Sequence, residues 1–149
     1  MAGTKIGDVR QHVADSIAAL AAFDDVKVTA AWDVGSRARE RVYTTGAKFK
    51  QEPASMRGSG RTYRDEAGSF EVILRIEGVG KTPDWTIDRA ITLGTAIEEW
   101  VADHRNIAAD VPGVEWLVAK GDGRLIERFS DKGTLVQLSY TLAYHARLT

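Results

Sequence analysis

Residues 134–148 read TLVQLSYTLAYHARL, and their alternation decides the fold class. Apolar or aromatic side chains occupy every second position from Val136 to Leu148, with mostly polar side chains between them. This period of two predicts a half-buried β-strand. The run is long, because a typical strand has about five or six residues. We therefore expect this strand to extend past the domain or to cross a strongly twisted sheet.

The residues just before this strand predict two further strands. DKG at 131–133 is a turn signal, and GDG at 121–123 separates the β-patterned stretches 114–120 and 124–130. The last third of the chain is therefore predicted to be a three-strand meander.

Helical spacing appears twice upstream. The clearer case is residues 83–104, where Thr82 can cap the first turn and Pro83 suits the first helical position. Residues 5–23 repeat apolar side chains at steps of three and four, which predicts an N-terminal helix. Two more stretches alternate with the period of a strand, at residues 26–33 and 69–79.

Residues 37–68 are polar and rich in glycine. We expect a hairpin over 37–50 with a turn at Thr45-Gly46, followed by a flexible loop over 51–68. The whole chain, 1–149, is predicted to be one α+β domain. Its sheet is mixed or antiparallel, with two helices packed on one face and the hairpin and loop projecting.

The basic residues are concentrated in this same polar segment. Between residues 37 and 64 there are eight basic side chains and only two acids, Glu40 and Glu52, which gives a net charge of +6 against −1 for the whole chain. The candidate contact residues are Arg37, Arg39, Arg41, Lys48, Lys50, Arg57, Arg61 and Arg64.

Three interpretations of the basic segment stay open. The charges keep a solvated hairpin soluble, they contact an acidic surface of a neighbouring subunit or partner, or they touch a nucleic-acid backbone without sequence preference. The near-neutral balance of 20 basic and 21 acidic residues argues against a dedicated nucleic-acid binder.

The sequence offers no recognisable catalytic or metal site. It contains no cysteine, and His12, His104 and His145 lie far apart without the spacing of metal ligands. The run from Gly78 to Thr82 ends like a phosphate-binding loop, but Arg75 stands where the first glycine is required. We predict a protein that is not an enzyme and uses no cofactor or metal.

Targeting signals are also missing from the sequence. The first residues lack the basic and apolar regions of a signal peptide, and no stretch is apolar for long enough to cross a bilayer. We expect a protein of the cytoplasm.

This order of elements resembles the tail terminator family of long-tailed (siphovirus-type) phages. The match covers nearly the whole chain: the helix at 6–23, the hairpin and loop at 37–68, the helix at 83–104 and the closing long strand. The resemblance implies a structural virion protein that forms a ring, usually a hexamer, at the head-proximal end of the tail. Such a ring caps the tail tube, stops its elongation and presents a surface to the head connector.

The partners implied by this resemblance are further copies of the chain, the tail tube protein and the head connector protein. We expect the basic segment to touch one of them or DNA in the lumen of the ring. Exposed aromatics can supply a ring interface, and the candidates are Trp32, Trp85, Trp100 and Trp116.

Three other functions remain open at this point. A head–tail connector or neck (head completion) protein would have a similar fold with a different neighbour. A small nucleic-acid-binding module would use the basic residues at 37–64. An enzyme of unrecognised type would need a deep pocket with several convergent titratable groups.

Overall fold

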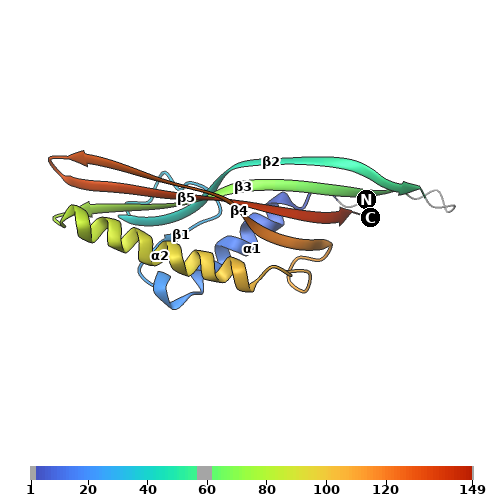
Figure 1. Ribbon diagram of the computed structural model, residues 1–149, viewed down its shortest axis with the longest axis horizontal. Helices are drawn as coiled ribbons and strands as arrows, with labels where there is room; N and C mark the ends of the chain where they lie inside the picture. The colour runs from blue at the N-terminus through green and yellow to red at the C-terminus, as the bar shows by residue number, and fades with distance from the viewer. Residues whose placement is uncertain (1–2, 57–61, 149) are drawn as a thin grey trace.

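The computed structural model describes residues 3–56 and 62–148, and those residues form a mixed α+β fold. The elements follow one another as α1 (Ile6–Ala18), a 3₁₀ turn η1 (Ala21–Phe23), β1 (Lys27–Val28), β2 (Glu40–Met56), β3 (Thr62–Val79), α2 (Pro83–Asp103), β4 (Val114–Ser130) and β5 (Gly133–Leu148). Figure 1 shows the two helices below an elongated sheet. The predicted α+β class and mixed sheet are therefore confirmed.

Among the described residues, the sheet has the strand order β1-β2-β3-β5-β4. β1 is parallel to β2, and every other neighbouring pair is antiparallel. α2 connects β3 to β4. β4 pairs with the edge of β5 that is not paired with β3. Among the described residues, β1 and the residues just after it bond to β2 only over the stretch 41–44, so most of the length of β2 lies at the edge of the sheet.

The core lies between the helices and one face of β3 and β5. Even-numbered residues of these two strands point toward the helices and include most of their buried side chains, although 137–141 are all half-buried and 142–144 are all buried. Gly94 brings α2 close to β5, because a Cβ built there would lie 2.5 Å from Leu138 Cδ2. The largest buried side chains of the two strands are Phe70, Leu74, Ile76, Leu142, Tyr144 and Leu148.

The second helix begins as the sequence predicted. The Thr82 side-chain oxygen accepts a hydrogen bond from the Trp85 N–H at 3.2 Å, and Pro83 occupies the first helical position. The first helix is shorter than the predicted 5–23. It stops at Ala18, and Leu20 adopts an extended conformation before η1 directs Phe23 into the core.

The predicted hairpin over 37–50 and loop over 51–68 are wrong. β2 runs from Glu40 to Met56 without a reversal and pairs with β3 from Thr62 onward. Gly46, with φ of 62°, lies in a register shift between Thr45 and Lys48, so the predicted turn at Thr45-Gly46 is a β-bulge. Only 57–61 of the predicted loop lie outside the described residues.

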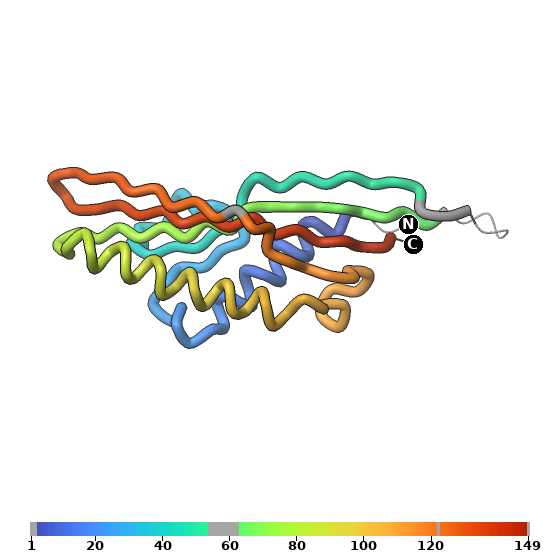
Figure 2. The backbone as a smooth tube through the Cα atoms, in the orientation of Figure 1, coloured from blue at the N-terminus to red at the C-terminus, as the bar shows by residue number. Residues whose placement is uncertain are grey.

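The predicted hairpin at 121–123 is also wrong, because these residues lie in a second register shift and not in a turn. β4 is one strand from Val114 to Ser130, and its register against β5 shifts between Ala119 and Gly123. Figure 2 shows β4 continuing past this shift to the turn before β5. The predicted meander of three strands is therefore two long strands, and the turn at 131–132 is confirmed.

The predicted strand at 26–33 is largely wrong, since only Lys27 and Val28 pair with β2. Beyond them the backbone makes two further hydrogen bonds to β2, from the Thr29 N–H to Val42 O and from the Thr44 N–H to Ala30 O. The chain then leaves the sheet edge through a turn at Val34 and Gly35.

Candidate interaction groove on the sheet

The β2 bulge changes which side chains face the core. Before it, the even-numbered residues Val42 and Thr44 are buried. After it, Lys48 pairs with Ser69 and Lys50 pairs with Ala67, so the even-numbered residues lie on the opposite face and are exposed. One extra residue inverts the alternation of a strand. The bulge therefore directs two lysines to the face away from the helices.

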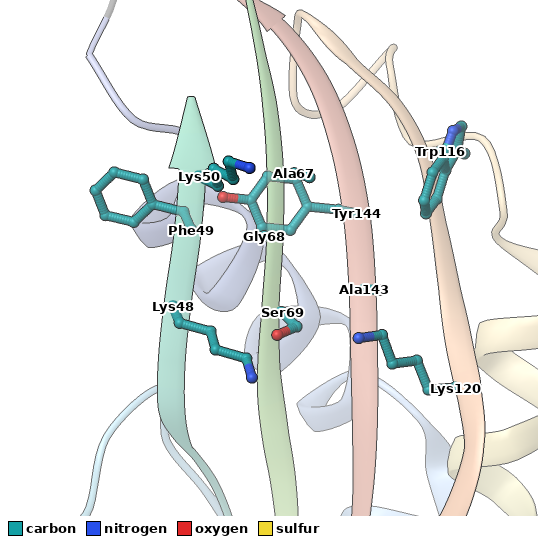
Figure 3. Close-up of a pocket in the computed structure, with 10 residues that line it drawn as sticks. All are labelled: Lys48, Phe49, Lys50, Ala67, Gly68, Ser69, Trp116, Lys120, Ala143 and Tyr144. Carbon is teal, nitrogen blue, oxygen red and sulfur yellow. The ribbon is translucent and has the colours of Figure 1, made fainter. Parts of the chain in front are cut away.

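These lysines border a shallow groove with a cavity volume of about 360 Å³. Its floor consists of small residues, Ala67 and Ser69 on β3 and Ala143 on β5. Figure 3 shows the Lys48 and Lys120 side chains reaching inward from β2 and β4 on the two sides. The other lining residues are Phe49, Lys50, Gly68, Trp116 and Tyr144.

The groove lies across four strands, so its two rims come from distant parts of the sequence. Neighbouring strands are roughly 4.8 Å apart, which places the β2 rim and the β4 rim roughly 14 Å from each other. Among the described residues Lys48 and Lys120 have no ion-pair partner, while Lys50 Nζ lies 2.8 Å from Glu52 Oε1. The rims are thus positively charged around a floor of small residues.

A hydrogen-bonded histidine–glutamate pair and an arginine–aspartate ion pair extend the groove toward the end of β5. His145 Nδ1 lies 2.8 Å from Glu115 Oε2, and its ring stacks on Trp116 at a centroid distance of 5.9 Å. Arg147 Nε lies 3.3 Å from Asp65 Oδ1. Acidic and basic groups alternate here, so the unbalanced positive charge is confined to the lysines.

Directly below the groove, on the core face, Glu66 is fully buried. Its Oε1 accepts hydrogen bonds from Thr4 Oγ1 at 3.0 Å, the Lys5 N–H at 2.8 Å and the Tyr144 hydroxyl at 2.6 Å. Its Oε2 accepts one from Gln51 Nε2 at 2.7 Å. A single carboxylate therefore joins the start of α1 to β2, β3 and β5.

The hydrogen bonds determine the charge state of this carboxyl group. Burial by itself raises the pKa of Glu66, but the donors Tyr144, Gln51, the Lys5 N–H and Thr4 together outweigh burial, so the pKa lies below its usual value. Burial and the neighbouring carboxylate raise the pKa of the Tyr144 hydroxyl. The tyrosine therefore stays protonated and donates to an ionised Glu66 at neutral pH.

Gly68 allows Tyr144 to reach Glu66. The two residues are cross-strand partners, and a Cβ at Gly68 would lie 2.3 Å from Tyr144 Cε1. Figure 3 shows the Tyr144 ring crossing β3 at Gly68. A glycine is required here because the aromatic ring occupies the space of a side chain.

The predicted basic residues separate into several groups. Arg37 and Arg39 are exposed in the segment before β2, and Lys48 and Lys50 lie at the groove. Arg64 Nη1 donates to Gln51 Oε1 at 2.9 Å. The predicted contact residues Arg57 and Arg61 lie outside the described residues.

Arg41 has a local structural role. Its guanidinium donates to the carbonyl oxygens of Ala38, Asp33 and Ser36, and it lies 4.6 Å from the centre of the Trp32 ring. It therefore holds the segment before β2 in place. Lys120, by contrast, joins Lys48 at the groove although sequence reasoning did not select it, since a lysine 72 positions away gives no signal without the strand order.

The tryptophans and histidines occupy different environments. Trp100 is buried and Trp116 lines the groove. Trp32 is 42% exposed and Trp85 is 40% exposed. Trp100 also lies between two histidines, with centroid distances of 6.0 Å to His12 and 4.8 Å to His104. Two of the three histidines therefore lie close to the same tryptophan ring.

Within the described ranges, no three His, Asp or Glu side chains are grouped so that they could hold a metal ion. No described helix has the length and apolar character needed to cross a membrane. Compared with known proteins, the sequence matches no protein-family model and no curated protein.

Proposed function

We propose that this chain is a structural virion protein that forms a ring, as a phage tail terminator does. In this role copies of the chain cap the tail tube at its head-proximal end and stop its elongation. The ring then joins the tail to the head connector, while DNA passes through its lumen. The partners are other copies of the chain, the tail tube protein and the connector protein.

The observation that carries this proposal is the exposure of large apolar side chains on the long strands. Phe49 on β2 is 51% exposed, and Phe129 and Leu125 on β4 are 65% and 43% exposed. Phe49 lies in the row of Gly68 and Tyr144, and Leu125 and Phe129 lie toward the other end of the sheet, so large apolar side chains are exposed at two separate places. Aromatic residues are enriched in interfaces. Assembly would remove these side chains from water.

The positions of the helices and hairpins also support a ring-forming role. Two helices on one face leave the other face of the sheet available, and the β2–β3 and β4–β5 hairpins point toward opposite ends of the sheet (Figure 1). A ring requires two different surfaces on each copy, joined by a rotation that closes. One sheet face and the projecting hairpins provide surfaces of that kind.

The test measures the mass of the purified protein and its binding to tail tubes. We expect a ring-sized oligomer, or a monomer that assembles on tube ends, visible by native mass spectrometry and electron microscopy. Binding to the head connector but not to tubes would favour a neck protein. A protein that stays monomeric and never joins tubes would contradict the proposal.

The alternative of another class, a small nucleic-acid-binding module, has less support from the positions of the basic side chains. Arg41, Lys50 and Arg64 already contact other groups of the protein, which leaves these side chains less available to a phosphate backbone. Salt-dependent binding of duplex DNA by the isolated protein would favour this alternative.

A further inference from the structure

We infer that the groove between Lys48 and Lys120 receives helix α2 of a neighbouring copy of this chain. The inference rests on the proposed ring-forming function and identifies the two surfaces that would meet. The groove belongs to the sheet face away from the helices, and α2 presents its exposed side on the other face. The two surfaces match in charge, width and side-chain size.

The exposed side of α2 is acidic. The helix contains five acidic residues and one basic residue, and that basic residue, Arg89, is already bonded to Glu40 at 2.7 Å. Asp84, Asp88 and Glu99 lie along one exposed stripe, since residues three, four or seven apart share a helix face. Within the described part of the chain none of these three carboxylates has an ion-pair partner, so the stripe offers negative charge to a basic partner.

The centre of this stripe carries little bulk. Ile91, which is 50% exposed, and Thr95 lie between Asp88 and Glu99. The groove has the matching order, with small residues on its floor and lysines at its rims. Two surfaces that meet are expected to match small or apolar residues at their centres and to place acidic groups of one beside basic groups of the other at the edges.

The dimensions of the two surfaces also agree. Asp88 and Glu99 are eleven residues apart, which corresponds to roughly 16 Å along a helix. The two lysine-bearing rims stand roughly 14 Å apart, at three strand spacings. A helix lying across the groove therefore places one acid near each rim and Ile91 and Thr95 over the small residues of the floor.

The positions of the two surfaces determine the kind of assembly. They lie on opposite faces of the molecule, so a two-fold axis cannot engage both in one dimer. Each copy instead uses its groove toward one neighbour and its helix toward the other, which is a heterologous contact. Contacts of this kind generate a ring when the rotation between neighbours closes.

The test reverses the charges on each surface separately and then on both. A groove-reversed variant carries Lys48→Glu and Lys120→Glu, and a helix-reversed variant carries Asp88→Lys and Glu99→Lys. A charge-swapped variant carries all four changes. The control variant, Lys27→Glu with Lys132→Glu, makes the same charge change at exposed lysines that do not line the groove.

Native mass spectrometry and light scattering at low salt give the oligomer mass of each variant. Where the wild type assembles only on tail tubes, the copies bound per tube are counted instead. We expect at least tenfold weaker assembly for each reversed variant and wild-type behaviour for the control. Assembly should return in the charge-swapped variant and in an equimolar mixture of the two reversed variants. Circular dichroism checks that each variant is folded.

The outcomes separate this inference from the proposed function. If groove-reversed protein still forms rings that cap tubes, the interface is wrong and the proposed function stands. If assembly follows the charges but the rings never bind tubes, the interface stands and the function is wrong. Groove-dependent, salt-sensitive binding of a DNA duplex with unchanged assembly would assign the groove to nucleic acid and overturn the inference.

Discussion

The two faces of the sheet differ in where they place charge around neighbouring residues of β3: a charged group is buried on the core face, and charged groups are exposed on the outer face. On the core face, Glu66 is fully buried and receives four hydrogen bonds. On the outer face, one residue further along β3, Ala67 lies in the floor of a groove whose lysines are exposed. A buried charge without partners is costly, whereas an exposed charge costs little. The inner carboxylate therefore serves stability, and the outer lysines are available for a partner.

The largest expected effect comes from Glu66→Ala. The substitution leaves the buried Tyr144 hydroxyl and the partly buried Gln51 amide and Lys5 N–H without their acceptor, and we expect a loss of about 3 kcal/mol in the free energy of unfolding. Urea denaturation measures the loss. The matched control is Glu71→Ala, an exposed glutamate on the same strand. Equal effects of the two substitutions would show that the buried carboxylate has no special role.

A somewhat smaller effect is expected from Gly68→Ala. The new methyl group would overlap the Tyr144 ring and push its hydroxyl away from Glu66, at a cost of about 2 kcal/mol. Thermal unfolding measures this cost. Gly121→Ala is the control, since nothing lies within 4 Å of a Cβ built there. If Gly68→Ala unfolds like the wild type, Tyr144 does not depend on a glycine beneath it.

Removing one donor should cost less than removing the acceptor. Tyr144→Phe keeps the ring over Gly68 but removes the hydroxyl that donates to Glu66, and we expect a loss of about 1 kcal/mol. Because three donors remain, the fold should persist with the same spectrum by circular dichroism. A loss as large as that of Glu66→Ala would mean that the tyrosine alone supports the buried charge.

The pH dependence of stability follows from the lowered pKa of Glu66. The group has a usual value of 4.5 when unfolded and a lower value when folded. Its contribution is therefore fully present above pH 4.5 and is lost as the pH falls through the folded-state pKa. We expect the melting temperature of the wild type to fall below pH 4.5 more steeply than that of Glu66→Gln. Parallel curves would contradict this assignment.

The smallest effect on stability is expected on the outer face. Lys48→Ala with Lys120→Ala should change the free energy of unfolding by less than about 0.5 kcal/mol, because both side chains are exposed. The same substitutions should weaken assembly, measured by light scattering. A large loss of stability in the monomer would mean that these lysines support the fold and would remove the contrast between the two faces.

Local signals in the sequence were sufficient for some elements. The start of α2 follows from Thr82 and Pro83, whose effects act within one helical turn. The core-facing side of β5 follows from the apolar residues at every second position from Val136 to Leu148, five of which are buried. These features depend on near neighbours in the chain, so they can be predicted without the fold.

Other features depend on residues distant in sequence. Gly46 and Gly123 looked like turn glycines, and only pairing with β3 and β5 distinguishes a bulge from a turn. Glu66 lay in a predicted loop because its partners Thr4 and Tyr144 are 62 and 78 positions away. Lys120 could not be predicted for the same reason, because the strand order β2-β3-β5-β4 is what places it at the groove.

The most direct test of the proposed contact uses the absence of cysteine from the chain. A variant with Ser69→Cys in the groove floor and Thr95→Cys on α2 would carry one thiol on each surface. Mild oxidation should link copies through these two positions, because a disulfide forms only when the Cα atoms are about 4.4–6.8 Å apart. Non-reducing electrophoresis should then show a ladder of dimers, trimers and larger chains up to the closed ring. A product that stays monomeric would contradict the account. So would a product that stops at a dimer, because a dimer can form by linking Ser69→Cys of one copy to Ser69→Cys of another.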